Sequence, residues 1–275
     1  MQQILDLLPL VGMMLATGVV AGILAGLLGV GGGIVIVPVL DTALGFYGVD
    51  SAIRMHVAIA TSLACIVLTS ISSAKAHHAK GSVDLGLVKR WGPFIFVGSL
   101  LGTVAAAYID SMTLSAVFGG VALIVALKML LPLGDVTLRD DVPRGVMLAF
   151  PPTMIGGLSS MMGIGGGTLS VPVLTLLNQP IHKAVGTAAL FGLFISVPGT
   201  LGFIFSGLND ARTPAGSLGY VNLIGFALIS PVTVWCAPIG AKIAHKLSKD
   251  QLSKVFGAFL LIVSARMLYR VLGGA

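Results

Sequence analysis

An internal duplication divides this sequence into two related halves. The segment GILAGLLGVGGGIVIVPVL at Gly22–Leu40 recurs as GGLSSMMGIGGGTLSVPVL at Gly156–Leu174, with ten of nineteen positions identical. A second pair, LSAVFGGVALIVALKML from Leu114 and LSKVFGAFLLIVSARML from Leu252, follows in the same order. Such self-similarity is typical of a fold that is built twice from one structural unit. We therefore expect the same ordered set of elements in each half.

The composition predicts that both halves lie in a lipid bilayer. Of the 275 residues, 56% are hydrophobic and only 9% are charged, whereas a soluble domain carries about a quarter charged residues. We attribute the net charge of +6 to cytoplasmic loops, and we expect no nucleic-acid partner. About 20 apolar residues make one helical span, so we predict an all-α polytopic membrane protein.

Apolar runs between polar breaks predict about five helical elements in each half. Eight runs are long enough for a span, and two short runs, which we interpret as half-helices, follow the glycine triplets. The long runs are Pro9–Leu28, Ser51–Ala74, Val88–Tyr108, Thr113–Leu131, Val142–Met162, Ile181–Phe205, Gly219–Ala241 and Gln251–Leu272. The short runs are Ile34–Phe46 and Thr168–Leu177.

The distribution of basic residues predicts that the two halves are inverted relative to each other. Short cytoplasmic loops collect lysine and arginine. The loop after Ala74 is basic, whereas its repeat equivalent offsets one arginine with one aspartate; the next pair of loops shows the opposite bias. Equivalent loops on opposite sides require an odd number of crossings in each half, either five or three with a re-entrant hairpin. We predict inverted repeats with both termini outside, at residues 1–132 and 142–275, with a linker at 133–141.

The glycine triplets are the candidate substrate site. Glycine costs about 1 kcal/mol in a helix relative to alanine, and broken backbone at membrane depth is tolerated only where it is buried in protein or lines a cavity. The helix start after each triplet has free N–H groups and a positive dipole end, which favour an anion. Close helix packing is the alternative explanation. The expected backbone ligands are Gly31, Gly32, Gly33 and Ile34 in the first half, and Gly165, Gly166, Gly167 and Thr168 in the second.

The paired GxGGGxxxxPxL motifs, together with two further motifs, resemble the sulfite exporter TauE/SafE family. The further motifs are the Ala-x-x-Thr sequences at Ala58–Ser62 and Ala184–Ala188 and the basic segment His77–Gly81. The resemblance covers nearly the whole chain. It implies a secondary transporter of the inner membrane that moves sulfite, organosulfonates or related small anions. The family's half-motif often reads Gly-Thr-Ser, whereas this chain has Ala60-Thr61-Ser62 and Gly186-Thr187-Ala188.

Several polar residues within the apolar runs are further candidates. Thr61, Ser62 and Thr187 lie deep in their runs, where each hydroxyl either bonds to the carbonyl of the preceding turn or lines the anion site. His56 and His182 occupy matching positions near the starts of two spans. Each either anchors its span at the membrane interface, or relays a proton or binds the anion.

These features predict a transporter that binds a small sulfur oxyanion near the half-helix starts and exposes it alternately to the two sides of the membrane. Its expected partners are the anion, the lipid bilayer, a coupling proton and a second copy of the chain, and it needs no metal or other cofactor. A carrier of carboxylates or sulfate and an anion channel are the alternatives. An intramembrane enzyme is disfavoured because the sequence has no Gly-x-Ser-x-Gly elbow.

Overall fold

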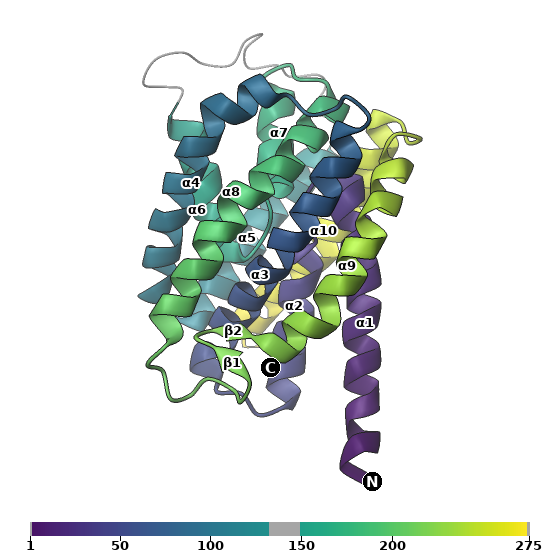
Figure 1. Ribbon diagram of the computed structural model, residues 1–275. Helices are drawn as coiled ribbons and strands as arrows, with labels where there is room; N and C mark the ends of the chain where they lie inside the picture. The colour runs from purple at the N-terminus through teal and green to yellow at the C-terminus, as the bar shows by residue number, and fades with distance from the viewer. Residues whose placement is uncertain (1, 132–148, 274–275) are drawn as a thin grey trace.

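Each glycine triplet marks the point at which one apolar helix ends and a short helix begins. The computed structural model describes residues 2–131 and 149–273. In it, α1 (Gln2–Leu28) is followed by α2 (Gly33–Phe46), and α6 (Phe150–Met162) is followed by α7 (Gly167–Leu176) (Figure 1). Both short helices begin within one residue of their predicted starts.

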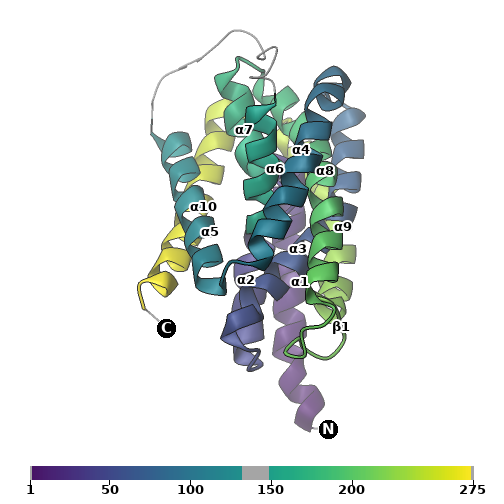
Figure 2. The same cartoon turned by 90° about the vertical axis from the view of Figure 1, so that its left-hand side faces the viewer.

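Three longer helices follow each of these pairs. The first set is α3 (Ser51–His78), α4 (Leu85–Ala107) and α5 (Ser111–Leu130). The second set is α8 (Ile181–Gly207), α9 (Leu223–Ala244) and α10 (Lys249–Val271). An antiparallel hairpin of β1 (Ser217–Leu218) and β2 (Val221–Asn222) connects α8 to α9. The predicted helical architecture is confirmed, and both chain ends lie toward the same end of the bundle (Figures 1 and 2).

Six helices of the described residues are long and apolar enough to cross a membrane, so the chain is a multi-pass membrane protein. They are α1, α3, α4, α5, α8 and α9. The prediction of eight long spans is not confirmed. The beginning of the predicted run Val142–Met162 lies outside the described residues, and α10 is not among the six. With 14 and 10 residues, α2 and α7 extend about 21 and 15 Å, well short of a ~30 Å hydrocarbon layer.

Helices from the two halves are interleaved. The main neighbours are α1 with α9, α4 with α6, α5 with α10, and α3 with α8. Figure 2 shows α5 and α10 side by side at one edge of the bundle, on the side opposite α9. The centre is occupied by α3, whose apolar window is 78% buried, against 39–50% for the apolar windows of the other five spans. Residues of α3 therefore contact most of the bundle.

Candidate substrate site at the paired glycine loops

The two glycine loops, Gly29–Gly33 and Gly163–Gly167, contact each other inside the bundle. The Gly165 N–H donates to the Val30 carbonyl oxygen at 2.9 Å. A Cβ atom on Gly33 would overlap the Gly163 carbonyl oxygen, and one on Gly165 would overlap that of Val30. The structure thus brings the two predicted triplets together, and their close backbone packing requires glycine independently of any ligand.

The first loop also requires glycine for its backbone conformation. Gly29, Gly31 and Gly32 have φ angles of 67°, 74° and 82°, a region that side-chain-bearing residues rarely adopt. In the second loop Gly163 has a φ of 65°, but Gly166 is right-handed at −58°. The two loops therefore reach their helix starts by different backbone paths, although their motifs are nearly identical.

Each loop leads into the positive end of a short helix. In α2 the first hydrogen bond of the helix is donated by the Val35 N–H to Gly32 O at 3.0 Å. In α7 it is donated by the Ser170 N–H to Gly166 O at 2.9 Å. The earlier N–H groups have no acceptor within the helix. Ile34 and Thr168, in these first turns, are both 0% exposed. Two buried helix starts close together favour an anion.

Thr168 adds a side-chain donor to the start of α7. Its Oγ1 atom is buried and has no hydrogen-bond partner among the residues that the structure describes. A buried hydroxyl left unpaired costs about 1–3 kcal/mol. The repeat equivalent of Thr168 is Ile34, which has no hydroxyl, so this donor is present on one side only.

A matched pair of buried serines was not predicted from the sequence. Ser70 in α3 and Ser196 in α8 are buried, and neither hydroxyl has a partner within the described part of the chain. Ser70 Oγ lies against Gly192, and Gly192 in turn adjoins Gly166. The register that pairs Thr61 with Thr187 also pairs Ser70 with Ser196. Extending that register along the helices was the signal that could have identified them.

The hydroxyls of Thr61 and Thr187 have protein partners instead. Thr61 Oγ1 donates to Val57 O at 2.7 Å and accepts the Asn222 N–H at 2.9 Å. Thr187 Oγ1 accepts the Asp84 N–H at 3.0 Å. Asn222 and Asp84 are the N-caps of α9 and α4. Each threonine therefore holds the start of a helix that belongs to the other half of the chain.

Ser62 and the two candidate histidines also have defined neighbours. Ser62 Oγ donates to Gly163 O at 2.7 Å, so it contacts the second glycine loop directly. His56 lies near the start of α3, with Nε2 3.1 Å from Ala106 O in the last turn of α4. His182 lies beside His245, with ring centroids 5.4 Å apart. The structure therefore brings Ser62 to the loops but places the two histidines in separate surroundings.

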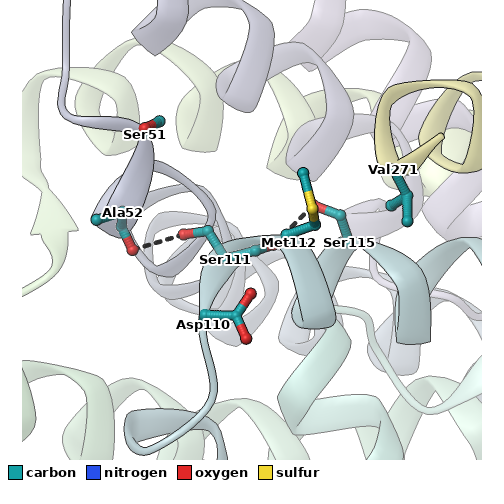
Figure 3. A pocket seen from close by; sticks show the side chains of 7 residues that line it. All are labelled: Ser51, Ala52, Asp110, Ser111, Met112, Ser115 and Val271. Atoms are coloured by element: carbon teal, nitrogen blue, oxygen red, sulfur yellow. Dashed lines mark hydrogen bonds between the residues drawn. The ribbon is translucent and has the colours of Figure 1, made fainter. Parts of the chain in front are cut away.

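A pocket of about 220 Å³ lies at the starts of α3 and α5 (Figure 3). Ser111 Oγ donates to Ala52 O at 2.8 Å and lies 3.5 Å from His56 Nδ1. The pocket is lined by Ser51, Ala52, Asp110, Ser111, Met112, Ser115 and Val271. None of these residues belongs to the glycine loops, and none was predicted as a site residue.

Two basic residues from the edge helices contact the short helices. Lys128 Nζ in α5 donates to Pro172 O of α7 at 2.6 Å. Its repeat equivalent, Arg266 in α10, donates to the Thr42 hydroxyl of α2. Both cations thus lie beyond the middle of a short helix, where the negative end of the helix dipole favours positive charge.

An ion-pair network attaches the α8–α9 connection to the start of α3. Arg212 donates to both carboxylate oxygens of Asp210, at 2.8 and 2.7 Å, and its guanidinium lies 3.9 Å from Asp50. The Arg212 guanidinium lowers the pKa of Asp210 well below its usual range. Burial, aided by a 2.9 Å hydrogen bond to Asp210, raises the pKa of Tyr220 to about 12. The connection is therefore held in place by charged and polar contacts.

The chain is similar to known membrane transporters over almost its whole length. Residues 14–267 match the family described as "Sulfite exporter TauE/SafE". The chain belongs to the TauE/SafE family. The resemblance seen in its motifs is thus confirmed, and this TauE/SafE protein is a membrane transporter and not an enzyme.

Relatives of this TauE/SafE protein carry matching names. It is 33% identical over 258 residues to a Haemophilus influenzae protein named "Probable membrane transporter protein", covering 93% of this chain and 97% of the relative. It is 27% identical over 278 residues to YunE of Bacillus subtilis, a protein named in the same way, with 92% and 95% covered. No solved structure is significantly similar to the chain.

Proposed function

We propose that this TauE/SafE protein is a secondary carrier that moves a small sulfur oxyanion, sulfite or an organosulfonate, across the inner membrane by alternating access. The observation that carries the proposal is the meeting of two buried helix starts, where the Gly165 N–H bonds to Val30 O. The anion binds near the N-termini of α2 and α7, with the Thr168 hydroxyl as a side-chain donor. Free N–H groups and two positive dipole ends supply the attraction.

In this proposal the two halves are inverted repeats at residues 1–132 and 142–275, with the linker at 133–141. Matching residues make matching contacts across the halves. Thr61 accepts from the N-cap of α9 and Thr187 from the N-cap of α4. Lys128 reaches α7 and Arg266 reaches α2. A pseudo-two-fold axis in the membrane plane explains all four contacts.

Although α1 is long enough for a span, in this proposal α1 forms a re-entrant hairpin with α2, as α6 does with α7. Each half then crosses the membrane three times, with α3, α4 and α5 in the first half and α8, α9 and α10 in the second. Gly33 lies against Ile66 in the middle of α3, and Gly45 lies against Arg54 near its start. The short helix α2 therefore runs back along one half of α3. The basic loops require an odd number of membrane crossings in each half, and three crossings meet this requirement. With three crossings in each half, both termini lie outside.

Transport in this proposal requires the two glycine loops to shift relative to each other. An added Cβ would overlap backbone at Gly33, Gly165 and Gly167 alike, so no anion fits between the loops in the packed arrangement. The anion instead binds beside them, next to Thr168. Opening toward one side and then the other follows from movement of one repeat against its partner, as in other inverted-repeat carriers.

Uptake of labelled sulfite into proteoliposomes tests the substrate. Taurine, sulfoacetate, sulfate and acetate serve as competitors under an imposed pH gradient, and Ser206→Ala, which removes an exposed hydroxyl, serves as the control variant. We expect saturable uptake that is blocked by sulfonates and not by acetate. Competition by acetate or sulfate alone would identify a different anion carrier, and no competition by any sulfur oxyanion would refute the assignment. An anion channel is the remaining alternative, and counterflow separates it from a carrier.

A further inference from the structure

Three histidines from different helices cluster at the end of α3 that is opposite His56. His77 lies in the last turn of α3, His182 lies at the start of α8, and His245 follows α9 directly. The ring centroid of His245 is 5.5 Å from that of His77 and 5.4 Å from that of His182, with which it is stacked. The cluster thus joins residues from both halves of the chain.

Two ring nitrogens in this histidine cluster are buried without a partner. His77 is 1% exposed, and its Nε2 donates to Gly26 O in α1 at 2.7 Å. Its Nδ1 has no hydrogen-bond partner within residues 2–131 and 149–273, and neither has His245 Nε2. An unpaired buried polar atom costs about 1–3 kcal/mol. Both nitrogens are therefore available to a ligand.

Each histidine of the cluster, once protonated, acts on its neighbours as a cation. The charges that act on His77 come from His182 and His245, and those that act on His245 come from His182 and from Lys80 in the α3–α4 connection. The contact of the cluster with α1 is the hydrogen bond from His77 Nε2 to the Gly26 carbonyl oxygen, which carries no charge. Burial, and then the neighbouring His182 and Lys80 charges, lower the pKa of His245. Adding a proton to His245 is therefore unfavourable unless an anion arrives with it.

We propose that His77, His182 and His245 form a proton-linked anion site, which binds a small oxyanion together with a proton at the basic end of the bundle. A protonated imidazole has two N–H donors. His77 Nδ1 and His245 Nε2 then donate charge-assisted hydrogen bonds to the oxyanion. The positive end of the α8 dipole lies at His182 and adds to the attraction. The inference rests on the proposed function, for which it supplies the coupling ion.

The chemistry of the cluster favours an anion over a metal ion. Within the part of the chain that the structure describes, no group of three histidine, cysteine or acidic residues is placed to hold a metal. His182 and His245 are partly exposed, and Lys80 of the α3–α4 connection acts electrostatically on His245.

Occupancy of the site is connected to the packing of the bundle. His77 bonds to Gly26, and Gly26 packs so tightly on α9 that an added Cβ would overlap Ala237 O. His245 ends the same helix α9. A proton and an anion at the cluster therefore act on the contact between α1, α3 and α9, which includes helices from both repeats.

Calorimetric titration of the purified full chain with methanesulfonate tests the site, because this sulfonate keeps one negative charge over the whole range used. Binding is measured between about pH 5.5 and about pH 7.5, in buffers of different ionisation enthalpy that report proton uptake. For wild type we expect net proton uptake and an affinity that falls by up to about tenfold per pH unit as the pH rises through this range. The variants are His77→Gln with His245→Gln, His245→Gln alone, and His78→Gln as the exposed neighbouring control.

We expect the double variant to bind without proton uptake, the single His245→Gln variant to take up less, and His78→Gln to match wild type. Proton uptake that is unchanged in the His245→Gln and double variants, or wild-type affinity that does not vary with pH, would overturn the site. Labelled sulfite uptake by the same proteins separates the two proposals. Wild-type binding without proton uptake, together with intact sulfite uptake, would refute only the histidine site, whereas proton-linked binding without any sulfite uptake would refute only the sulfite assignment.

Discussion

Replacing Thr168 by valine separates a role in binding from a role in folding. Valine keeps the branched shape of threonine and removes only Oγ1, which is buried and lacks a partner among the described residues. An unpaired buried hydroxyl destabilises the fold by about 1–3 kcal/mol. Without substrate, the Thr168→Val variant is therefore expected to be as stable as wild type or more stable by up to that amount, as measured by thermal melting in detergent.

The same substitution is expected to weaken transport. A hydrogen bond to a charged group contributes about 1.5–3 kcal/mol. At about 1.4 kcal/mol for each factor of ten, the KM for sulfite should rise about 10- to 100-fold in proteoliposome uptake. Ser206→Ala is the matched control, because its hydroxyl is exposed and bonds to its own helix. A Thr168→Val protein that is less stable than wild type but has an unchanged KM would refute the ligand role of this hydroxyl.

Three other substitutions test the packing and the charges. Gly165→Ala places a Cβ atom against the Val30 carbonyl oxygen and should abolish the yield of folded protein in size-exclusion chromatography. Gly120→Ala is the control, because the added Cβ atom meets no neighbouring atom within 4 Å, and it should leave that yield unchanged. Thr187→Val leaves the N–H at the start of α4 without its acceptor and should lower the free energy of unfolding by about 1–3 kcal/mol; an unchanged denaturant midpoint would contradict this. Arg212→Gln removes the cation that lowers the pKa of Asp210. A carboxyl group whose pKa is lowered in the folded state stabilises the fold at pH values above its unfolded pKa of about 3.9, and this stabilisation is lost as the pH falls toward the folded pKa. The difference in melting temperature between Arg212→Gln and wild type should therefore be constant above about pH 4 and become smaller below it. A difference that does not change with pH would contradict the ion pair.

The sequence predicts the helices well because lipid leaves few alternatives. Backbone groups in a bilayer must be paired within the chain, so an apolar run there forms a helix. The run Ile34–Phe46 corresponds to α2 at Gly33–Phe46, and Thr168–Leu177 corresponds to α7 at Gly167–Leu176. The β-hairpin was missed because its two strands have only two residues each, too few for an alternating pattern; they pair with each other, and the Asn222 N–H also donates to Thr61.

The candidate site could be predicted only in part. The doubled motif identified the two glycine loops, which the structure brings into contact. Which hydroxyls are paired depends on the helix from the other half that each one faces, and sequence periodicity does not show this. For Thr61 and Thr187 the sequence left a ligand role and a bond to the preceding turn open. Thr61 makes that bond, to Val57 O, and both hydroxyls also accept the N–H of an N-cap residue from the other half. The clustering of His77 with His245 has no signal in their spacing.

Counterflow of labelled sulfite tests the central claim most directly. Proteoliposomes loaded with unlabelled sulfite are diluted into a trace of labelled sulfite, and uptake is compared with that of unloaded vesicles. An alternating-access carrier that has released unlabelled sulfite outside binds labelled sulfite there and carries it into the vesicle. We therefore expect labelled sulfite inside the vesicles to rise transiently above its equilibrium level, and to rise less with the Thr168→Val variant. Equal uptake by loaded and unloaded vesicles, from protein shown to be folded, would contradict alternating access and indicate a channel.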